Sequence, residues 1–135
     1  GARHITVANR TLAKAQALVQ SHSVLAALQK AELSAQDPLA LSAYFDVIIN
    51  ATASSLSGGG IPVPASVLRP GALAYDMMYG PAAQGFLDWA RQHGAVPRDG
   101  LGMLVEQAAE AFLLWRGVRP PSAQVLREMQ QSATA

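Results

Sequence analysis

Short apolar runs alternate along this chain with longer segments of mixed polarity. Residues 5–8, 45–49 and 72–78 are apolar and bounded by turn-forming residues, which is typical of buried strands. The run 45–49 holds three successive β-branched residues. We therefore expect it to be buried on both faces, as in a parallel sheet covered by helices. Val96 is a candidate for a minimal last strand.

The segments between these runs carry the end signals of helices. Thr11 fits the N-cap of a helix that should run to about residue 20, and Gly94 and Gly117 stand where two later helices should end. Segment 23–28 is ambiguous between strand and helix, and Asp37 with the following proline suits a helix start. Further helices are predicted at 64–68, 82–93, 103–116 and from Ser122 to about residue 130.

Strands that alternate with helices predict βαβ units and a doubly wound parallel sheet of the α/β class. No internal repeat and no linker divides the 135 residues, so we expect one domain. In such sheets ligands bind at the carboxyl ends of the strands. The residues directly after each strand are therefore the candidates for a functional site.

Composition narrows the classes of function. Half of the residues are hydrophobic and 14% are charged, which indicates a globular protein. A net charge of +1 without a dense basic run argues against nucleic-acid or membrane-surface binding, and no apolar run is long enough to cross a membrane. The chain has no cysteine and its three histidines lack metal-ligand spacing, so we expect no metal site and a cytoplasmic location.

Asn9, Arg10 and Thr11 follow the first strand. In a dinucleotide-binding fold this position meets the adenine ribose, where an acid selects NAD and an arginine accommodates the 2′-phosphate of NADP. Here Asn9 is neutral, the planar fork of Arg10 suits a phosphate, and Lys14 lies one helical turn further on. The alternative is an ordinary turn with two solvated cations, which the tripeptide alone favours.

Two further strand ends carry polar side chains. Asn50 and Thr52 are small and polar, which suits close approach of a ligand, although an ordinary loop explains them nearly as well. Tyr79 would present its hydroxyl to a polyol or carboxylate at the edge of the sheet. Asp76 stands inside an apolar strand and needs a partner, for which the backbone of the following Gly-Pro turn is nearest.

Gly100 and Gly102 stand at the entrance of the helix 103–116, where they permit close approach of a ligand. Gln107 interrupts an apolar stripe of this helix, so it either bonds to backbone or faces a ligand. Glu106 and Glu110 fall on the outer face and should be solvated.

Together these segments resemble shikimate dehydrogenase, the NADP-dependent enzyme family of the aromatic amino-acid pathway. The resemblance extends from about Ile5 to the last helix, and its anchors stand in order at family spacing: residues 9–11, 45–52, 75–79 and 99–108. The sequence departs from the family at 53–56, where Ser or Pro and then Gly are usual, which leaves the contacts of that loop open.

The resemblance implies roles for individual residues. One group would line the pocket for the 2′-phosphate of NADP: Asn9, Arg10, Thr11 and Lys14. A second group would lie near the cofactor, toward the nicotinamide: Thr52, Met77 and Gly100. Two side chains would contact shikimate or 3-dehydroshikimate: Tyr79 and Gln107.

The resemblance also implies that parts of the enzyme lie outside these residues. The family's catalytic lysine and aspartate belong to an N-terminal substrate domain without a counterpart here, and neither Lys14 nor Lys30 matches that position. The first strand and its glycine-rich pyrophosphate loop would precede Gly1. We therefore expect residues 1–135 to form a single partial NADP-binding domain with an incomplete Rossmann-like sheet, C-terminal helices and no catalytic residue.

Loss of the central strand would leave open strand edges at Ile5 and Phe45. Three arrangements would close this gap: direct pairing of the two strands, a second copy of the chain in a homo-oligomer, or upstream polypeptide.

The leading hypothesis is the cofactor-binding part of a shikimate dehydrogenase, which reduces 3-dehydroshikimate with NADPH by hydride transfer. We expect the isolated chain to be inactive. One alternative is a quinate/shikimate relative, although Arg10 without an adjacent acid favours NADP over NAD. The other is a non-catalytic α/β nucleotide-binding or interaction module of similar topology.

Overall fold

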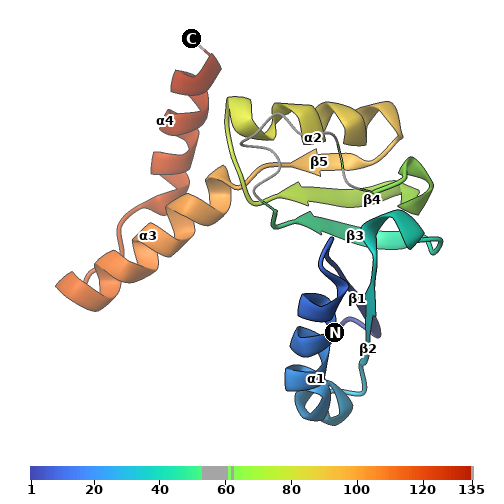
Figure 1. Cartoon of the computed structure of the whole chain (residues 1–135). Helices are drawn as coiled ribbons and strands as arrows, with labels where there is room; N and C mark the ends of the chain where they lie inside the picture. The colour runs from blue at the N-terminus through green and yellow to red at the C-terminus, as the bar shows by residue number, and fades with distance from the viewer. Residues whose placement is uncertain (53–60, 62, 135) are drawn as a thin grey trace. The chain divides into compact units, whose positions relative to one another are not determined.

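The computed structural model describes residues 1–52, 61 and 63–134 (Figure 1). The chain divides into two compact units, Gly1–Tyr44 with Pro62–Val67 and Phe45–Ile61 with Leu68–Ala135. The expectation for residues 53–56 lies outside the described residues. Both units contain parallel strands and helices, which confirms the α/β class.

The first unit is a βαβ element. Its elements are β1 (His4–Ala8), α1 (Leu12–Leu28), β2 (Glu32–Gln36) and two short 3-10 helices, η1 (Pro38–Ala40) and η3 (Ala65–Val67). β1 and β2 pair in parallel, with Ile5 opposite Leu33. The ambiguous segment 23–28 is helical and extends α1 well beyond residue 20, and β2 is a strand that the sequence pattern did not predict.

Thr11 occupies the N-cap position of α1, but its side chain makes no capping hydrogen bond. The expected capping role of its hydroxyl is therefore wrong. Asn9 performs a related task instead, because its Oδ1 accepts a hydrogen bond from the Thr11 N–H at 2.8 Å. An amide side chain two residues earlier thus satisfies a backbone donor at the helix entrance.

The second unit contains a parallel sheet of three strands. Its elements are β3 (Phe45–Asn50), β4 (Leu68–Asp76), α2 (Pro81–Gln92), β5 (Val96–Arg98), α3 (Leu101–Arg116) and α4 (Ser122–Thr134). The strand order is β3-β4-β5, and α2 lies along one face of this sheet (Figure 1). Phe86 and Leu87 of α2 pack with Ala74 of β4 to form the core of this unit.

On the opposite face of this sheet, two side chains of β3 are exposed. Val47 and Ile49 of β3 are 51% and 61% exposed. The expectation that residues 45–49 are buried on both faces is therefore wrong for this structure. Ile48 points to the other side and packs against the core, so the alternation along β3 is that of a strand covered on one face.

The helices α2 and α3 end at the two glycines that the sequence indicated. Gly94 has φ 76° directly after the C-cap of α2, and Gly117 has φ 69° at the C-cap of α3. Both values lie in the left-handed region that glycine adopts without a steric penalty. The expected ends of these two helices are confirmed.

β1 and β3 are edge strands. Among the described residues, β1 pairs with β2 alone and β3 pairs with β4 alone. Within its own unit, each of these two strands has one edge without a strand partner. None of the helices described is long and apolar enough to span a bilayer.

Candidate functional site

The turn after β1 carries two exposed cations. Arg10 and Lys14 are both exposed, and neither takes part in an ion pair within the described part of the chain. The Lys14 N–H donates to the Thr11 carbonyl at 2.9 Å and closes the first bond of α1. The turn therefore presents two positive side chains at a helix N-terminus, an arrangement that favours anions.

A carboxylate stands at the end of the neighbouring strand. Asp37 follows β2, and its Oδ1 accepts a hydrogen bond from the Leu39 N–H at 2.8 Å. It thereby caps the 3-10 helix η1. The turn that holds Asn9, Arg10 and Thr11 contains no acid of its own.

The second unit has a hydrogen-bond network at the carboxyl ends of β3 and β4. Asp76 is wholly buried and lies opposite Asn50, which is also buried. The Asn50 Nδ2 donates to Asp76 Oδ2 at 3.0 Å, and the Met78 N–H donates to Asp76 Oδ1 at 2.8 Å. Asp76 thus finds its partners in Asn50 and Met78, and the expected partner in the Gly80 turn is wrong.

Asn50 connects this carboxylate to Thr52. The Asn50 Oδ1 accepts two hydrogen bonds from Thr52, one from the N–H at 3.1 Å and one from the hydroxyl at 2.8 Å. We name the side chains of Asn50, Thr52 and Asp76, with these bonds, the edge network. It fixes the first residues that leave β3.

Gly100 lies against the loop that follows β4. A Cβ atom at this position would come within 2.1 Å of the Met77 carbonyl oxygen. The Gly100 N–H donates to the Met78 carbonyl at 2.8 Å, and the Met77 N–H donates to the Asn50 carbonyl at 3.0 Å. Backbone bonds and the edge network therefore hold together the ends of β3 and β4 and the start of α3.

The side chains expected to reach a ligand are accessible. Met77, Tyr79 and Gln107 are all exposed. For Gln107 this corrects the expectation of a buried face, because the buried line of α3 consists of Leu101, Val105 and Ala109.

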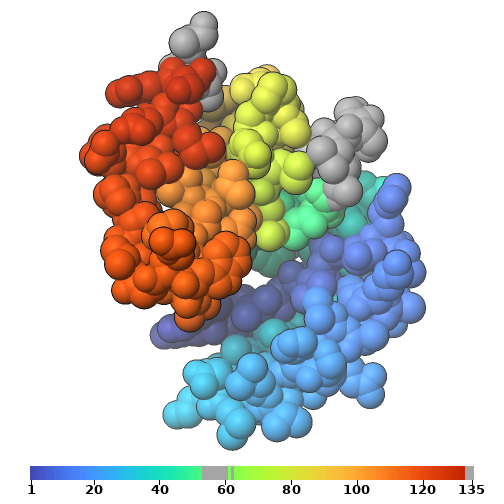
Figure 2. Space-filling view, turned by 90° about the vertical axis from the view of Figure 1, so that its left-hand side faces the viewer, coloured from blue at the N-terminus to red at the C-terminus, as the bar shows by residue number. Residues whose placement is uncertain are grey.

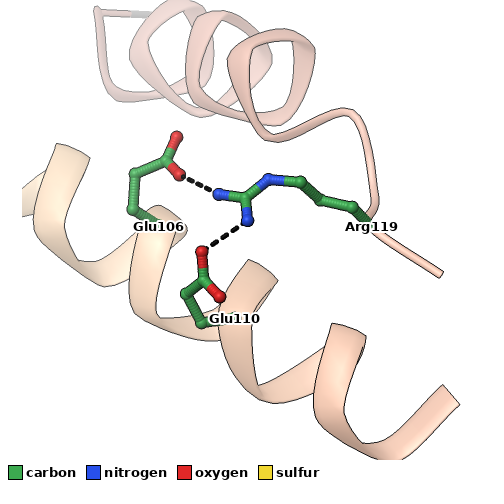
Figure 3. Close-up of polar contacts among 3 residues, drawn as sticks. All are labelled: Glu106, Glu110 and Arg119. Carbon is green, nitrogen blue, oxygen red and sulfur yellow. Dashed lines mark hydrogen bonds and ion pairs between the residues drawn. The ribbon is translucent and has the colours of Figure 1, made fainter. Parts of the chain in front are cut away.

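Arg119 fastens the segment between the two C-terminal helices to α3. It lies in the segment between α3 and α4 and pairs with Glu106 at 3.1 Å and with Glu110 (Figure 3). Hydrogen bonding to Glu110 and the charges of both glutamates raise the pKa of Arg119 above its ordinary value. The expectation that Glu106 and Glu110 are merely solvated is wrong, and only an i, i+4 pair of acids near an arginine hinted at this contact.

An apolar groove of about 230 Å³ lies between α3 and α4, with Leu104, Phe112 and Met129 in its walls. The two helices pack together, as the orange and red atoms of Figure 2 show. The side chains that line the groove carry no ionisable group, so it offers packing surface and not chemistry. Nowhere in the described ranges do three His, Cys, Asp or Glu side chains gather closely enough to hold a metal ion.

The candidate residues thus fall into two groups. Asn9, Arg10, Thr11 and Lys14 share one turn of the first unit, whereas Thr52, Met77, Tyr79, Gly100 and Gln107 belong to the second. Sequence inspection missed how Asn50 and Asp76 work together, although both were noted as polar residues at strand ends.

Comparisons with known proteins identify relatives. Residues 100–130 match the family model of the Shikimate 5'-dehydrogenase C-terminal domain. The shikimate dehydrogenase (NADP(+)) of Verminephrobacter eiseniae is 78% identical over 133 residues, which cover 98% of this chain and 46% of the relative. The chain spans about half the length of the curated relatives it matches.

Solved structures agree with this relationship. Shikimate 5-dehydrogenase from Thermus thermophilus, in complex with NADP(H) and shikimate, is 28% identical with a TM-score of 0.72 over 95% of this chain and 45% of that chain. Quinate dehydrogenase from Corynebacterium glutamicum, in complex with NAD, is 27% identical with a TM-score of 0.76 over 96% and 46%. The expected Rossmann-like fold class is thereby confirmed. The chain belongs to the shikimate dehydrogenase family and matches its C-terminal domain.

Proposed function

We propose that this chain is the NADP-binding part of a shikimate dehydrogenase, which reduces 3-dehydroshikimate to shikimate with NADPH. One observation carries the proposal: the turn after β1 presents Arg10 and Lys14, exposed and outside any described ion pair, and has no acid of its own. The names of the relatives, shikimate dehydrogenase (NADP(+)), support the same cofactor.

The chemistry of this turn favours a phosphate over a ribose hydroxyl. A 2′-phosphate accepts hydrogen bonds and carries negative charge, so a guanidinium fork and an ammonium both stabilise it. Asp37, at the end of the neighbouring strand β2, caps η1 by accepting a hydrogen bond from the Leu39 N–H and is not part of this turn. Each charge-assisted hydrogen bond contributes about 1.5–3 kcal/mol, or roughly 10- to 100-fold in affinity.

In this proposal the second unit binds the reacting end of the cofactor and part of the substrate. Thr52, Met77 and Gly100 would lie by the nicotinamide, and Tyr79 and Gln107 would contact shikimate. The bound cofactor supplies the hydride. The residues of this chain bind and orient, and the proton is handled by a lysine and an aspartate outside it, so the isolated chain should lack dehydrogenase activity.

A quinate/shikimate dehydrogenase that uses NAD is the second candidate. It is favoured by the likeness to the quinate dehydrogenase solved in complex with NAD. The two candidates make different predictions for Arg10, because NAD carries a neutral hydroxyl at the ribose 2′ position and no phosphate that a cation would bind.

The test uses a hybrid enzyme in which this chain replaces the corresponding 133 residues of the Verminephrobacter eiseniae relative. Arg10→Ala should raise KM for NADPH about tenfold or more and leave KM for NADH almost unchanged. Arg3→Ala is the matched control, since it removes an exposed cation just before the other end of β1.

Equal effects of Arg10→Ala on both cofactors would contradict NADP selection by this turn. Oxidation of quinate with NAD in preference to shikimate with NADP would favour the second candidate. Measurable shikimate oxidation by the 135-residue chain alone would contradict the assignment of the proton-transfer residues to another part of the enzyme.

The open edges of β1 and β3 support a further part of the proposal. We infer that residues 1–135 work as one partial NADP-binding domain, whose strand edges pair with a further segment of polypeptide or with a second copy. Light scattering and hydrogen exchange test this. A monomer of the chain in which the amides on the open edges of β1 and β3 are unprotected would contradict a second copy, and the same exchange pattern in the hybrid enzyme would contradict a further segment.

A further inference from the structure

We propose that Asp76 is a positioning residue that makes Thr52 a hydrogen-bond acceptor toward the bound cofactor, acting through the side chain of Asn50. This inference rests on the proposed function, because it assigns a polarity to a residue of the proposed nicotinamide site. It concerns a buried carboxylate that itself has no access to a ligand.

The first step is the orientation of the Asn50 amide. A carboxylate only accepts hydrogen bonds, and both oxygens of Asp76 do so, one from the Met78 N–H and one from Asn50 Nδ2. If the amide were turned over, two oxygens would face each other at 3.0 Å in a buried place. Asp76 therefore holds the NH2 end of Asn50 toward itself.

The second step follows from the first. With its NH2 group at Asp76, Asn50 turns its Oδ1 toward Thr52, where it accepts from the N–H at 3.1 Å and from the hydroxyl at 2.8 Å. An amide oxygen cannot donate. The Thr52 hydroxyl must therefore donate its single proton to Asn50.

The third step gives the consequence at the surface of the protein. Thr52 is an exposed residue directly after β3, and in this proposal its hydroxyl oxygen contacts the ligand. Its proton is engaged by Asn50, so the oxygen can only accept, and the matching group on the ligand must be an N–H or O–H donor. The carboxamide NH2 and the ribose hydroxyls at the nicotinamide end of NADP are such donors.

The experiment is a double-mutant cycle in the hybrid enzyme, with the Kd for NADP from calorimetry as the readout. Thr52→Val removes the hydroxyl at nearly constant shape, and Asp76→Asn allows the Asn50 amide to turn over. Each single change should weaken binding about two- to tenfold. If Asp76 acts through Thr52, the double variant should bind as weakly as Thr52→Val and no more weakly.

Asp99→Asn serves as the matched control. Asp99 is another carboxylate at this edge of the sheet, where its Oδ1 accepts from the Leu101 N–H at 3.3 Å and not from the edge network. Its effect should add to that of Thr52→Val. Additive effects of Asp76→Asn and Thr52→Val, with normal NADP binding by the unmodified hybrid, would overturn the inference. Loss of NADP binding by the unmodified hybrid would instead overturn the proposed function.

A second measurement needs no variant. In the 135-residue chain, NMR should detect scalar couplings across the hydrogen bonds from Asn50 Nδ2 to the Asp76 carboxyl carbon and from the Thr52 amide nitrogen to the Asn50 amide carbon. Both couplings together report the orientation of Asn50. Loss of both couplings, in a spectrum that shows the backbone coupling from the Met77 amide nitrogen to the Asn50 carbonyl carbon, would refute the inference even if Asp76→Asn does not fold.

Discussion

Replacement of Gly100 by alanine tests how tightly the start of α3 is held. A Cβ here would lie 2.1 Å from the Met77 carbonyl oxygen, whereas real Cβ atoms essentially never approach closer than 3.0 Å, so at least 3.0 − 2.1 = 0.9 Å of movement is needed. The obstacle is backbone, and it is held by the Met77 bond to Asn50 and the Gly100 bond to Met78. The backbone angles of Gly100, φ −81° and ψ 1°, are open to alanine, so the whole effect is steric.

The magnitude follows from these contacts. Overpacking of a filled site costs about 1–3 kcal/mol, and one lost backbone hydrogen bond adds roughly 0.5–1.5 kcal/mol. Gly100→Ala should therefore lower the free energy of unfolding by about 1.5–4.5 kcal/mol, measured by urea denaturation of the chain. In the hybrid enzyme it should also weaken NADP binding, because Met77 is displaced.

Gly102→Ala is the control, two residues further along. Gly102 lies inside α3, and the nearest atom to an added Cβ is Leu126 Cδ2 at 4.0 Å. Alanine is the better helix former, so this change should raise the stability by about 0.5–1 kcal/mol. The two substitutions should thus have opposite signs. If Gly100→Ala is as stable as the unmodified chain, the close approach of Gly100 and Met77 is not a feature of the protein.

Three further outcomes can be measured by the same denaturation assay. Phe86→Ala empties the core between α2 and the sheet and should cost about 3–5 kcal/mol; a loss below that of an exposed-site alanine would contradict this core. Gly85→Ala, with open space around its Cβ in α2, should stabilise by about 0.5–1 kcal/mol, and a loss would show a contact there. Arg119→Ala should cost little, and less at high salt. Because the pKa of Arg119 is raised, its contribution is complete below its ordinary value and is lost only at still higher pH, so this cost should be equal at neutral and mildly alkaline pH.

Local sequence patterns predicted the elements whose residues have an intrinsic preference for the structure that they adopt. Val47, Ile48 and Ile49 indicated β3, and Gly94 and Gly117 marked two helix ends, because strand propensity and left-handed backbone are properties of a few adjacent residues. β2 escaped prediction because its sequence, Glu-Leu-Ser-Ala-Gln, has no β-branched residue. β2 is extended because it pairs with β1, and the hydroxyls of Thr6 and Ser34 are hydrogen-bonded across this pair at 2.9 Å.

The candidate site was predictable in position and less so in its internal contacts. Strand ends located Asn50, Thr52 and Tyr79, because parallel strands end at one edge. The bond between Asn50 and Asp76 joins residues 26 apart and depends on strand register, which local patterns do not specify. Gln107 was predicted on the wrong face of α3. This helix is apolar around most of its circumference, so the spacing of its apolar residues does not determine which of them are buried.

The pairing of Asn50 with Asp76 also has a consequence for the fidelity of folding. A slip of β4 by one residue against β3 would turn Asp76 to the opposite side of the sheet and place an apolar Ile49 or a loop residue across from it. In the misaligned state Asp76 would lose its amide partner, and Asn50 would lie buried beside apolar side chains. Burial of a charged or amide group without its hydrogen bonds lowers the free energy of unfolding. The same two side chains that orient Thr52 therefore favour the native register of β3 and β4, in which each is the hydrogen-bond partner of the other.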